Sequence, residues 1–201
     1  MSGVKICGLS RMEDIDAVNR ILPDFIGFVF APSRRRVDEK TAAALREKLD
    51  DRILPVGVFV NQDIELAANL YKNGVISLVQ LHGDEDGSYI KRLKESCGCP
   101  VIKSIGIADT LPPLPDTPDY LLFDTLSAQR GGIGKAFNWR VIKDFTAKPY
   151  FLAGGLSAGN AAEAIKILHP FCVDVSSGVE TDGVKDPEKI REFVRITRQV
   201  V

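Results

Sequence analysis

Short hydrophobic runs recur along the whole of the 201-residue chain. Most of them are apolar without alternation, as in Ile26-Gly27-Phe28-Val29-Phe30. Strands that are buried on both faces have this pattern, so the runs predict a parallel sheet covered by helices. The predicted strands are Val4–Cys7, Phe25–Phe30, Pro55–Val60, Ile76–Leu81, Pro100–Ile105, Tyr120–Asp124, Tyr150–Ala153 and Cys172–Ser176.

Amphipathic stretches separate the hydrophobic runs and carry the signals of helix starts. A serine, asparagine or aspartate at such a start can accept a hydrogen bond from a backbone N–H of the first turn. The predicted caps are Ser10, with Glu13 completing a capping box, Asp38, Asn61 and Asp186, which precedes a first-turn Pro187. The proline-rich stretch Gly106–Pro118 instead predicts a short or broken helix.

The succession of eight strand–helix units predicts an α/β fold, a compact single-domain (β/α)8 barrel. A barrel of this kind typically has about 250 residues, so this chain must use short loops. The alternative is an open, doubly wound sheet, which usually has about five or six strands. Because no linker or low-complexity segment interrupts the series, one domain is expected over residues 1–201.

The charge balance and the length of the apolar runs argue against two classes of partner, nucleic acids and membranes. Lys and Arg total 26 against 27 Asp and Glu, so the bulk positive charge of a nucleic-acid-binding protein is missing. The longest apolar runs, such as Ile53–Val60, are far shorter than the roughly 20 residues of a membrane span. We therefore expect no nucleic-acid partner and no membrane insertion.

The N-terminus and the cysteines bear on localisation and on metals. Residues Met1–Cys7 have neither the features of a signal peptide nor those of a transit segment. The four cysteines and two histidines have no zinc or redox spacing, and Cys97, Cys99 and Cys172 are interpreted as structural. A reduced, cytoplasmic protein without a metal or a cofactor is expected.

The loops after the seventh and eighth strands predict a phosphate site, because barrels frequently bind phosphate there. Glycines let backbone N–H groups approach an anion, and a helix N-terminus adds favourable partial charge. The candidate residues are Gly154, Gly155, Ser176, Ser177 and Gly178. If the anion binds in these loops, a branched side chain at Gly155 or at Gly178 would occupy its place. The alternative is that the glycines only form turns.

Ionisable residues end two of the predicted strands. Cys7 and Asp124 stand where a barrel would place a general base and a general acid. The alternatives are a buried cysteine that only packs and an aspartate that only caps a helix. Likewise, the Arg34–Arg36 run is either a solvated loop or a carboxylate site, since one arginine can hold a carboxylate through two hydrogen bonds. His82 either packs against a neighbouring loop or belongs to the site.

Eight blocks of residues, in order along the chain, carry a resemblance to a known family. The blocks are Lys5–Leu9, Gly27–Pro32, Val56–Asn61, Val79–Asp84, Phe123–Thr125, Gly131–Lys135, Leu152–Leu156 and Asp174–Glu180. Together they closely resemble the N-(5'-phosphoribosyl)anthranilate isomerase family of tryptophan biosynthesis, over essentially the whole chain.

The resemblance implies an Amadori rearrangement without cofactor or metal. The small-molecule substrate would be N-(5-phosphoribosyl)anthranilate and the product 1-(2-carboxyphenylamino)-1-deoxyribulose 5-phosphate. In this scheme Asp124, the general acid, protonates the ring oxygen of the sugar, and Cys7, the general base, removes the proton from C2. A thiol must lose its proton to act as a base, so we expect cationic surroundings at Cys7 and a partly desolvated Asp124.

Further roles come from the same resemblance. The family's carboxylate-binding arginine falls on Arg35, with Arg36 as the alternative, because three consecutive arginines leave the register open. His82 would contact the substrate. This chain departs from the family pattern at Ile133, where threonine is usual, and at Asn138, where aspartate is frequent.

Two rival functions remain beside this one. The first is another phosphosugar aminoaldose isomerase, such as that of the histidine pathway, which would have an aspartate in place of Cys7. The second is a barrel that binds a phosphorylated ligand without catalysis, which would not need ionisable residues on both strands. The sequence gives no oligomeric state.

Overall fold

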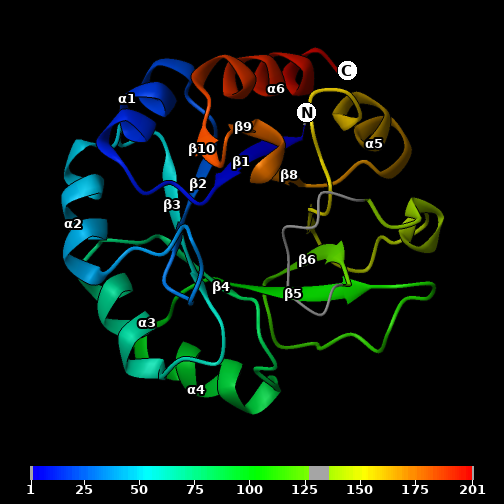
Figure 1. Cartoon of the computed structure of the whole chain (residues 1–201). Helices are drawn as coiled ribbons and strands as arrows, with labels where there is room; N and C mark the ends of the chain where they lie inside the picture. Colours follow the sequence, from blue (N-terminus) through cyan, green and yellow to red (C-terminus); the bar gives the residue numbers. More distant parts are fainter. Residues whose placement is uncertain (1, 127–135, 201) are drawn as a thin grey trace.

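In the computed structural model, which describes residues 2–126 and 136–200, eight parallel strands close into a barrel (Figure 1). Each strand lies beside its sequence neighbour, and β8 closes the ring against β1. The strands are β1 (Gly3–Cys7), β2 (Phe25–Val29), β3 (Leu54–Phe59), β4 (Leu78–Leu81), β5 (Val101–Ile107), β6 (Tyr120–Thr125), β7 (Tyr150–Leu152) and β8 (Cys172–Val175). All eight predicted strands are present within two residues of their expected bounds, and the barrel, not the open sheet, is confirmed. One domain over residues 1–201 stays a prediction.

Helices surround the barrel, with α1 to α4 following one another around one half of the ring (Figure 1). They are α1 (Met12–Ile21), α2 (Glu39–Lys48), α3 (Ile64–Lys72), α4 (Gly87–Cys97), α5 (Ala161–Leu168) and α6 (Pro187–Gln199). Short elements complete the fold: the 3-10 turns η1 (Trp139–Ile142) and η2 (Ser177–Val179), and a hairpin of β9 (Glu180–Thr181) and β10 (Val184–Lys185). The short or broken helix predicted over Gly106–Pro118 is wrong: these residues are all described, and the chain passes from β5 to β6 without a helix because its prolines cannot donate helical hydrogen bonds. None of the helices in the described ranges could cross a membrane.

The start of α1 differs from the predicted capping box by one residue. Asp14, not Glu13, supplies the carboxylate, which accepts the backbone N–H groups of Ser10 at 3.0 Å and Arg11 at 3.1 Å. Asp14 is buried and also receives the Arg11 guanidinium, whereas Glu13 is exposed to solvent. The buried carboxylate therefore sets the helix start, and the cap position is Arg11.

The predicted cap of α3 is wrong, because Asp63, not Asn61, precedes that helix. Asn61 has a left-handed backbone, with φ of 52°. Its side chain reaches across to the next loop, where its amide oxygen accepts the N–H of Asp84 at 2.7 Å. The caps predicted for α2 and α6, Asp38 and Asp186, are confirmed.

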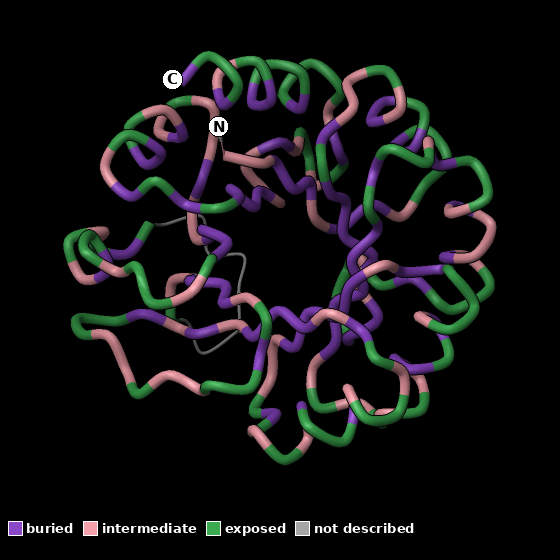
Figure 2. The backbone as a smooth tube through the Cα atoms, turned by 180° about the vertical axis from the view of Figure 1, so that it is seen from behind, coloured by how far each residue is buried: buried purple, intermediate pink, exposed green. Residues whose placement is uncertain are grey.

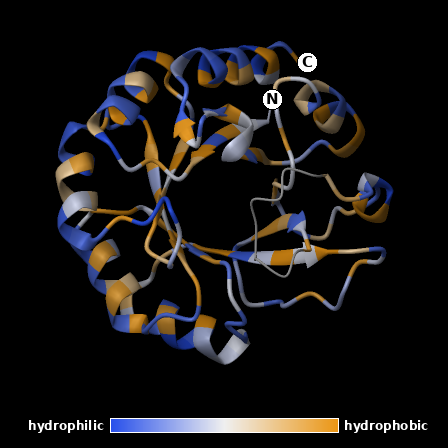
Figure 3. Cartoon of the chain, in the orientation of Figure 1, coloured by the Kyte–Doolittle hydropathy of each residue, from blue (hydrophilic) through white to orange (hydrophobic). Residues whose placement is uncertain are grey.

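The hydrophobic core has two parts. Figure 2 shows the buried segments of the chain that contribute to it. The larger part lies between the strands and the apolar faces of the helices, whose outer faces are hydrophilic (Figure 3). The smaller part fills the inside of the barrel; its buried members are Phe25, Val56, Leu78, Ile102, Leu122, Phe151, Ala153 and Cys172. Phe25 and Phe151 stack edge to face at 5.4 Å near the N-terminal ends of the strands. This end of the barrel is therefore plugged.

Strand alternation decides which polar residues share the interior with this plug. Val4, Ile6, Val79, Leu81 and Phe123 belong to the outer core, so their neighbours along each strand point inward. The inward residues beyond the plug include six that are polar or ionisable: Lys5, Cys7, Gln80, His82, Asp124 and Asp174. The C-terminal end of the barrel therefore holds a polar chamber.

Candidate active site

Cys7 and Asp124 enter this chamber from β1 and β6, which are separated by β7 and β8 around the ring. Both side chains are half-buried. Gly27 makes room for the thiol, because a Cβ at that position would lie 2.7 Å from Cys7 Sγ. Gly154 likewise leaves space for the carboxyl group on β6, because a Cβ added at Gly154 would lie 3.1 Å from Asp124 Oδ1. Two glycines thus leave space for the two candidate catalytic groups.

Lys5 and Asp174 form a buried ion pair just below Cys7. Lys5 Nζ lies 2.8 Å from Asp174 Oδ2, and the lysine is fully buried. Burial acts against the charged amine, but the Asp174 carboxylate outweighs it and raises the pKa of Lys5 above its usual range. Lys5 is therefore charged, two residues before the thiol on the same face of β1.

The cationic surroundings expected at Cys7 are present, yet they do not control the thiol. Burial raises the pKa of Cys7 above that of a free thiol, and the neighbouring Asp174 carboxylate acts in the same direction. The charges of Lys5 and Lys185 act against this effect and are outweighed. The protein without substrate thus holds Cys7 as a thiol. Neither lysine was singled out from the sequence as a partner of Cys7.

A second charged network lies beside Cys7, around Glu180 of β9. Arg35 donates to both oxygens of Glu180, at 2.7 and 2.9 Å, and Lys185 donates to one of them at 2.7 Å. These hydrogen bonds outweigh the effect of burial and lower the pKa of Glu180. The Arg35 side chain passes over Gly8, since a Cβ there would lie 2.4 Å from Arg35 Cδ.

The two predicted carboxylate-binding arginines have different positions. Only 17% of the Arg35 side chain is exposed, and it lies next to the residue that follows Cys7. Arg36 is exposed, and its backbone pairs with Val29 at the end of β2. Arg34, the first of the three, is exposed as well and contacts Glu180 at 2.6 Å.

His82 and Asp124, which were predicted separately, lie side by side in the structure. His82 Nε2 is 3.5 Å from Asp124 Oδ2. The other ring nitrogen, Nδ1, is 3.0 Å from the amide nitrogen of Gln80. His82 thus connects β4 to β6 across the chamber.

The backbone around His82 is fixed by a buried ion pair, here called the Lys103–Glu85 clamp. Glu85 accepts the backbone N–H of Asn61 at 2.6 Å and of Gly83 at 2.9 Å, and Lys103 Nζ lies 2.9 Å from the same carboxylate. Lys103 also donates to the Gly83 carbonyl at 2.6 Å. The clamp joins the loops after β3 and β4 and holds the residue that follows His82 from both sides.

The glycines of the candidate phosphate site have the backbone that a tight turn requires. Gly154 and Gly155 both have positive φ, 84° and 63°. The idea that a Cβ at Gly178 would occupy the anion's place is wrong, because it would meet the Leu156 carbonyl at 2.0 Å. Gly178 instead allows the loop after β8 to pack against the loop after β7.

The two candidate serines differ in what they contact. The Ser176 hydroxyl donates to the Cys7 carbonyl at 2.9 Å, and Lys185 donates to the Ser176 carbonyl at 2.9 Å. Ser177 is the first residue of η2. Lys185 therefore adds a positive charge near loops in which the sequence offered only main-chain donors.

The two departures from the family pattern have separate outcomes. Ile133 and its block Gly131–Lys135 lie outside the described residues. Asn138 caps η1 by accepting the N–H of Arg140 at 3.2 Å, the task that an aspartate would perform.

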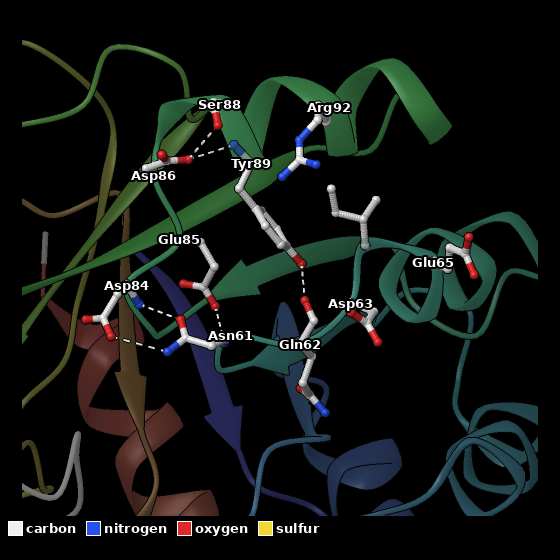
Figure 4. A pocket seen from close by; sticks show the side chains of 11 residues that line it. Asn61, Gln62, Asp63, Glu65, Asp84, Glu85, Asp86, Ser88, Tyr89 and Arg92 are labelled. Carbon is white, nitrogen blue, oxygen red and sulfur yellow. Dashed lines mark hydrogen bonds between the residues drawn. The ribbon is translucent and has the colours of Figure 1, made fainter.

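A groove of about 720 Å³ opens outside the chamber, between the starts of α3 and α4 (Figure 4). It is lined by carboxylates and amides, including Asp63, Glu65 and Asp86. Tyr89 crosses it and donates to the Gln62 carbonyl at 2.8 Å. Burial raises the pKa of Tyr89 to about 12, and Glu85 and Asp63 add to this effect. The groove contains none of the predicted site residues. No group of three or more potential metal ligands occurs in residues 2–126 and 136–200.

Comparison with known sequences points to one family. The sequence model for "N-(5'phosphoribosyl)anthranilate (PRA) isomerase" matches residues 4–196. An N-(5'-phosphoribosyl)anthranilate isomerase of Endomicrobium trichonymphae is 51% identical over 201 residues, with 100% of both chains covered. Its counterpart in Lachnoclostridium phytofermentans is 44% identical over 206 residues, with 94% of each chain covered.

Solved structures agree with the sequence relatives. The phosphoribosyl anthranilate isomerase of Thermus thermophilus superposes with a TM-score of 0.86 at 33% identity, with 100% of both chains covered. Another phosphoribosyl anthranilate isomerase, in complex with reduced 1-(o-carboxyphenylamino)-1-deoxyribulose 5-phosphate, gives a TM-score of 0.81 at 30% identity. That match covers 98% of this chain and 99% of the other.

Proposed function

The chain belongs to the N-(5'-phosphoribosyl)anthranilate isomerase family, and from that premise we propose that Cys7 and Asp124 are its general base and general acid. The protein is an isomerase of tryptophan biosynthesis that converts N-(5-phosphoribosyl)anthranilate to 1-(2-carboxyphenylamino)-1-deoxyribulose 5-phosphate. The observation that carries our assignment is that both groups project into one polar chamber from the C-terminal ends of two strands. The proposed setting is the cytoplasm, with residues 1–201 as one domain.

The first step opens the sugar ring. Asp124 transfers its proton to the ring oxygen as the bond between C1 and that oxygen breaks. The electron pair of the anthranilate nitrogen forms a double bond to C1, which gives an iminium ion, and Asp124 is left as a carboxylate. His82 Nε2, 3.5 Å away, is the nearest ring nitrogen to that carboxylate. Hydrogen bonds in an empty site are often longer than in the substrate complex.

The second step removes the proton from C2. The positive nitrogen acidifies this proton, so a side-chain base is sufficient. Cys7 accepts the proton and an enolamine forms, which then tautomerises to the ketone. Because burial raises the pKa of the Cys7 thiol, additional positive charge must favour the thiolate in the complex. The iminium nitrogen provides that charge and adds to those of Lys5 and Lys185, which do not suffice on their own.

Binding of the two ends of the substrate follows the same arrangement. Glu180 occupies the Nε and Nη2 side of Arg35, so the Nη1 side of the guanidinium is directed to the anthranilate carboxylate. Arg36 is the alternative for this role. The phosphate would bind the backbone N–H groups at Gly154, Gly155, Ser176, Ser177 and Gly178, with the charge of Lys185 nearby.

Turnover of phosphoribosylanthranilate by Cys7→Ser and Asp124→Asn tests the proposal directly. A general acid or base contributes typically about 10²–10⁴-fold, so each variant should lose at least two orders of magnitude in kcat while keeping the fold. Loss of substrate fluorescence gives the rate, and circular dichroism verifies the fold. A variant with parental kcat would remove that residue from the mechanism.

A further inference from the structure

Gln80 contacts His82 from inside the barrel and has no part in the mechanism described so far. It is 2% exposed and lies two residues before His82 on β4, so both side chains point inward. Its amide nitrogen is 3.0 Å from His82 Nδ1, while Nε2 on the opposite side of the ring faces Asp124. The imidazole ring is thus held between an amide and a carboxyl group.

The chemistry of these partners determines where the hydrogen of a neutral ring lies. A neutral imidazole has one N–H donor and one acceptor nitrogen. A carboxylate only accepts hydrogen bonds, so the nitrogen that faces Asp124, Nε2, must carry the hydrogen once Asp124 has given its proton to the substrate. Nδ1 is then an acceptor, and the amide N–H of Gln80 is the donor that it requires.

We propose that Gln80 is a positioning residue that holds His82 in the tautomer with hydrogen on Nε2, directed at Asp124. This inference rests on the proposed role of Asp124 as the general acid. When Asp124 gives its proton to the ring oxygen of the sugar, the new carboxylate meets a prearranged N–H from His82. A donor that is already aimed at developing charge lowers the barrier without reorganisation.

The other atom of the Gln80 amide supports a role in the site. Within the described residues, Gln80 Oε1 is buried without a hydrogen-bond partner. A buried polar atom without a partner lowers stability, so an apolar side chain of similar size would suit stability better. The amide at this position is therefore explained by its contact with His82 and not by packing.

The opposite orientation of the amide gives a different prediction. If Oε1 faced the ring, the hydrogen would lie on Nδ1, and the lone pair of Nε2 would point at the Asp124 carboxylate. Two acceptors would then face each other. The backbone offers little relief, because the His82 N–H is bonded to the Phe59 carbonyl at 2.8 Å and the Lys103–Glu85 clamp holds Gly83.

Nitrogen NMR of the full-length protein tests the tautomer directly. The chain has two histidines, so His169→Asn leaves the ring of His82 as the single imidazole signal. At a pH where this ring is neutral, the parent should show hydrogen on Nε2. Gln80→Glu has the same shape but only accepts hydrogen bonds when ionised, so it should place a hydrogen on Nδ1 as well and favour the doubly protonated ring. Gln80→Met, which does neither, should give a mixture.

Kinetics of the same variants give the second measurement. Gln80→Met should lower kcat by about 10–100-fold, the range found when the partner of a functional histidine is removed, with little change in KM. Its free energy of unfolding should equal or exceed that of the parent. Gln62→Met is the matched control, because Gln62 also has a buried Oε1 without a partner and one amide hydrogen bond, to the Phe30 carbonyl. It should change neither the tautomer nor kcat.

The results separate this inference from the proposed function. Hydrogen on Nδ1 in the parent, or an unchanged tautomer in both Gln80 variants, would overturn the role of Gln80. A changed tautomer with parental kcat would overturn it as well. Parental activity of Asp124→Asn would instead overturn the acid assignment, whatever the NMR result.

Discussion

Arg35 and the adjacent Arg36 lie in different surroundings although nothing separates them in the sequence. Its guanidinium is bonded to Glu180 beside Cys7, whereas Arg36 is exposed outside the chamber. Two arginines that are adjacent in the sequence thus have different surroundings: one lies beside Cys7 and the other is exposed to solvent. The register of three arginines could not be fixed from the sequence, because nothing in the run itself distinguishes which side chain faces Gly8.

Replacing these arginines separately tests that difference. Arg35→Ala should raise KM by roughly 10–100-fold, because a charge-assisted hydrogen bond to the carboxylate is worth about 1.5–3 kcal/mol. Arg36→Ala should have a much smaller effect. Steady-state kinetics with phosphoribosylanthranilate give both values. The opposite ranking would transfer the role to Arg36, and no effect in either variant would exclude both.

The pH dependence of Cys7 follows from its burial. Because its pKa in the folded protein is raised, the thiolate fraction at neutral pH is smaller than that of a free thiol. Alkylation of Cys7 by iodoacetamide should therefore be slow at pH 7 and should still accelerate above pH 9. The alkylation rate of a free thiol, with a pKa of about 8.5, levels off in that range. Mass spectrometry of the Cys7 peptide gives the rate, with N-acetylcysteine as the control. A rate that is constant from pH 7 upward would contradict the direction of this shift.

The same shift has a consequence for stability. A thiol whose pKa is raised on folding contributes stability below the pKa of the unfolded chain, and this contribution is lost as the pH rises through the folded value. The Cys7→Ser variant should therefore lose less stability than the parent on the alkaline side. Urea unfolding at several pH values gives the comparison.

At the scale of elements, the loops after β7 and β8 depend on each other at Gly178. A Cβ there would lie 2.0 Å from the Leu156 carbonyl, so any side chain separates the two loops. The proposed phosphate site is formed by these loops together, so its shape would depend on their contact. Close packing of backbone on backbone thus fixes the two loops of the proposed site relative to each other.

Inorganic phosphate gives a measurement of this site. It should compete with the substrate in the parent, and Gly178→Ala should weaken the competition by at least tenfold because the donors move apart. Gly87→Ala is the control, since its Cβ would meet Thr117 at an ordinary 3.6 Å. If millimolar phosphate leaves the parental rate unchanged, these loops do not form the phosphate site.

Hydrophobic runs and turn residues were sufficient to predict the strands, and the strand ends were sufficient to predict that Cys7 and Asp124 lie at the same end of the barrel. The sequence could not reveal contacts between distant elements. Lys5 looked like an ordinary strand residue until β8 placed Asp174 beside it. Lys185 reaches the site from the β9–β10 hairpin, which no hydrophobic run in the sequence predicts. Asn61 was misjudged for the same reason, because its partner lies in the loop after β4.

At the scale of the whole molecule, the proposed catalytic groups lie at one end of the barrel and an apolar plug fills the other end. The polar chamber lies at the C-terminal ends of the strands, and the aromatic plug lies at the N-terminal ends. Phe151 packs against Phe25, Tyr120 and Phe171 in that plug. Barrels of this class generally separate function and stability in this way.

Removing part of the plug tests the separation. Phe151→Ala should lower the free energy of unfolding by about 3–5 kcal/mol, the usual cost of such a cavity. Well below the melting temperature, kcat should stay within twofold of the parent. Phe171→Ala, at a position that is 43% exposed, should cost much less. A large loss of kcat in the first variant, with the fold intact, would show that the two ends are coupled.

Because no helix lies between β5 and β6, the chain can be split there into two pieces. The chain from Ala108 to Thr110 is exposed, and a break there cuts none of the described strands or helices. The two pieces would meet along two parallel ladders, β5 with β6 and β8 with β1. One piece would carry Cys7 and His82, and the other Asp124. If the two pieces were encoded by separate genes, neither product would be active alone. Growth without tryptophan would then show that the two pieces had associated.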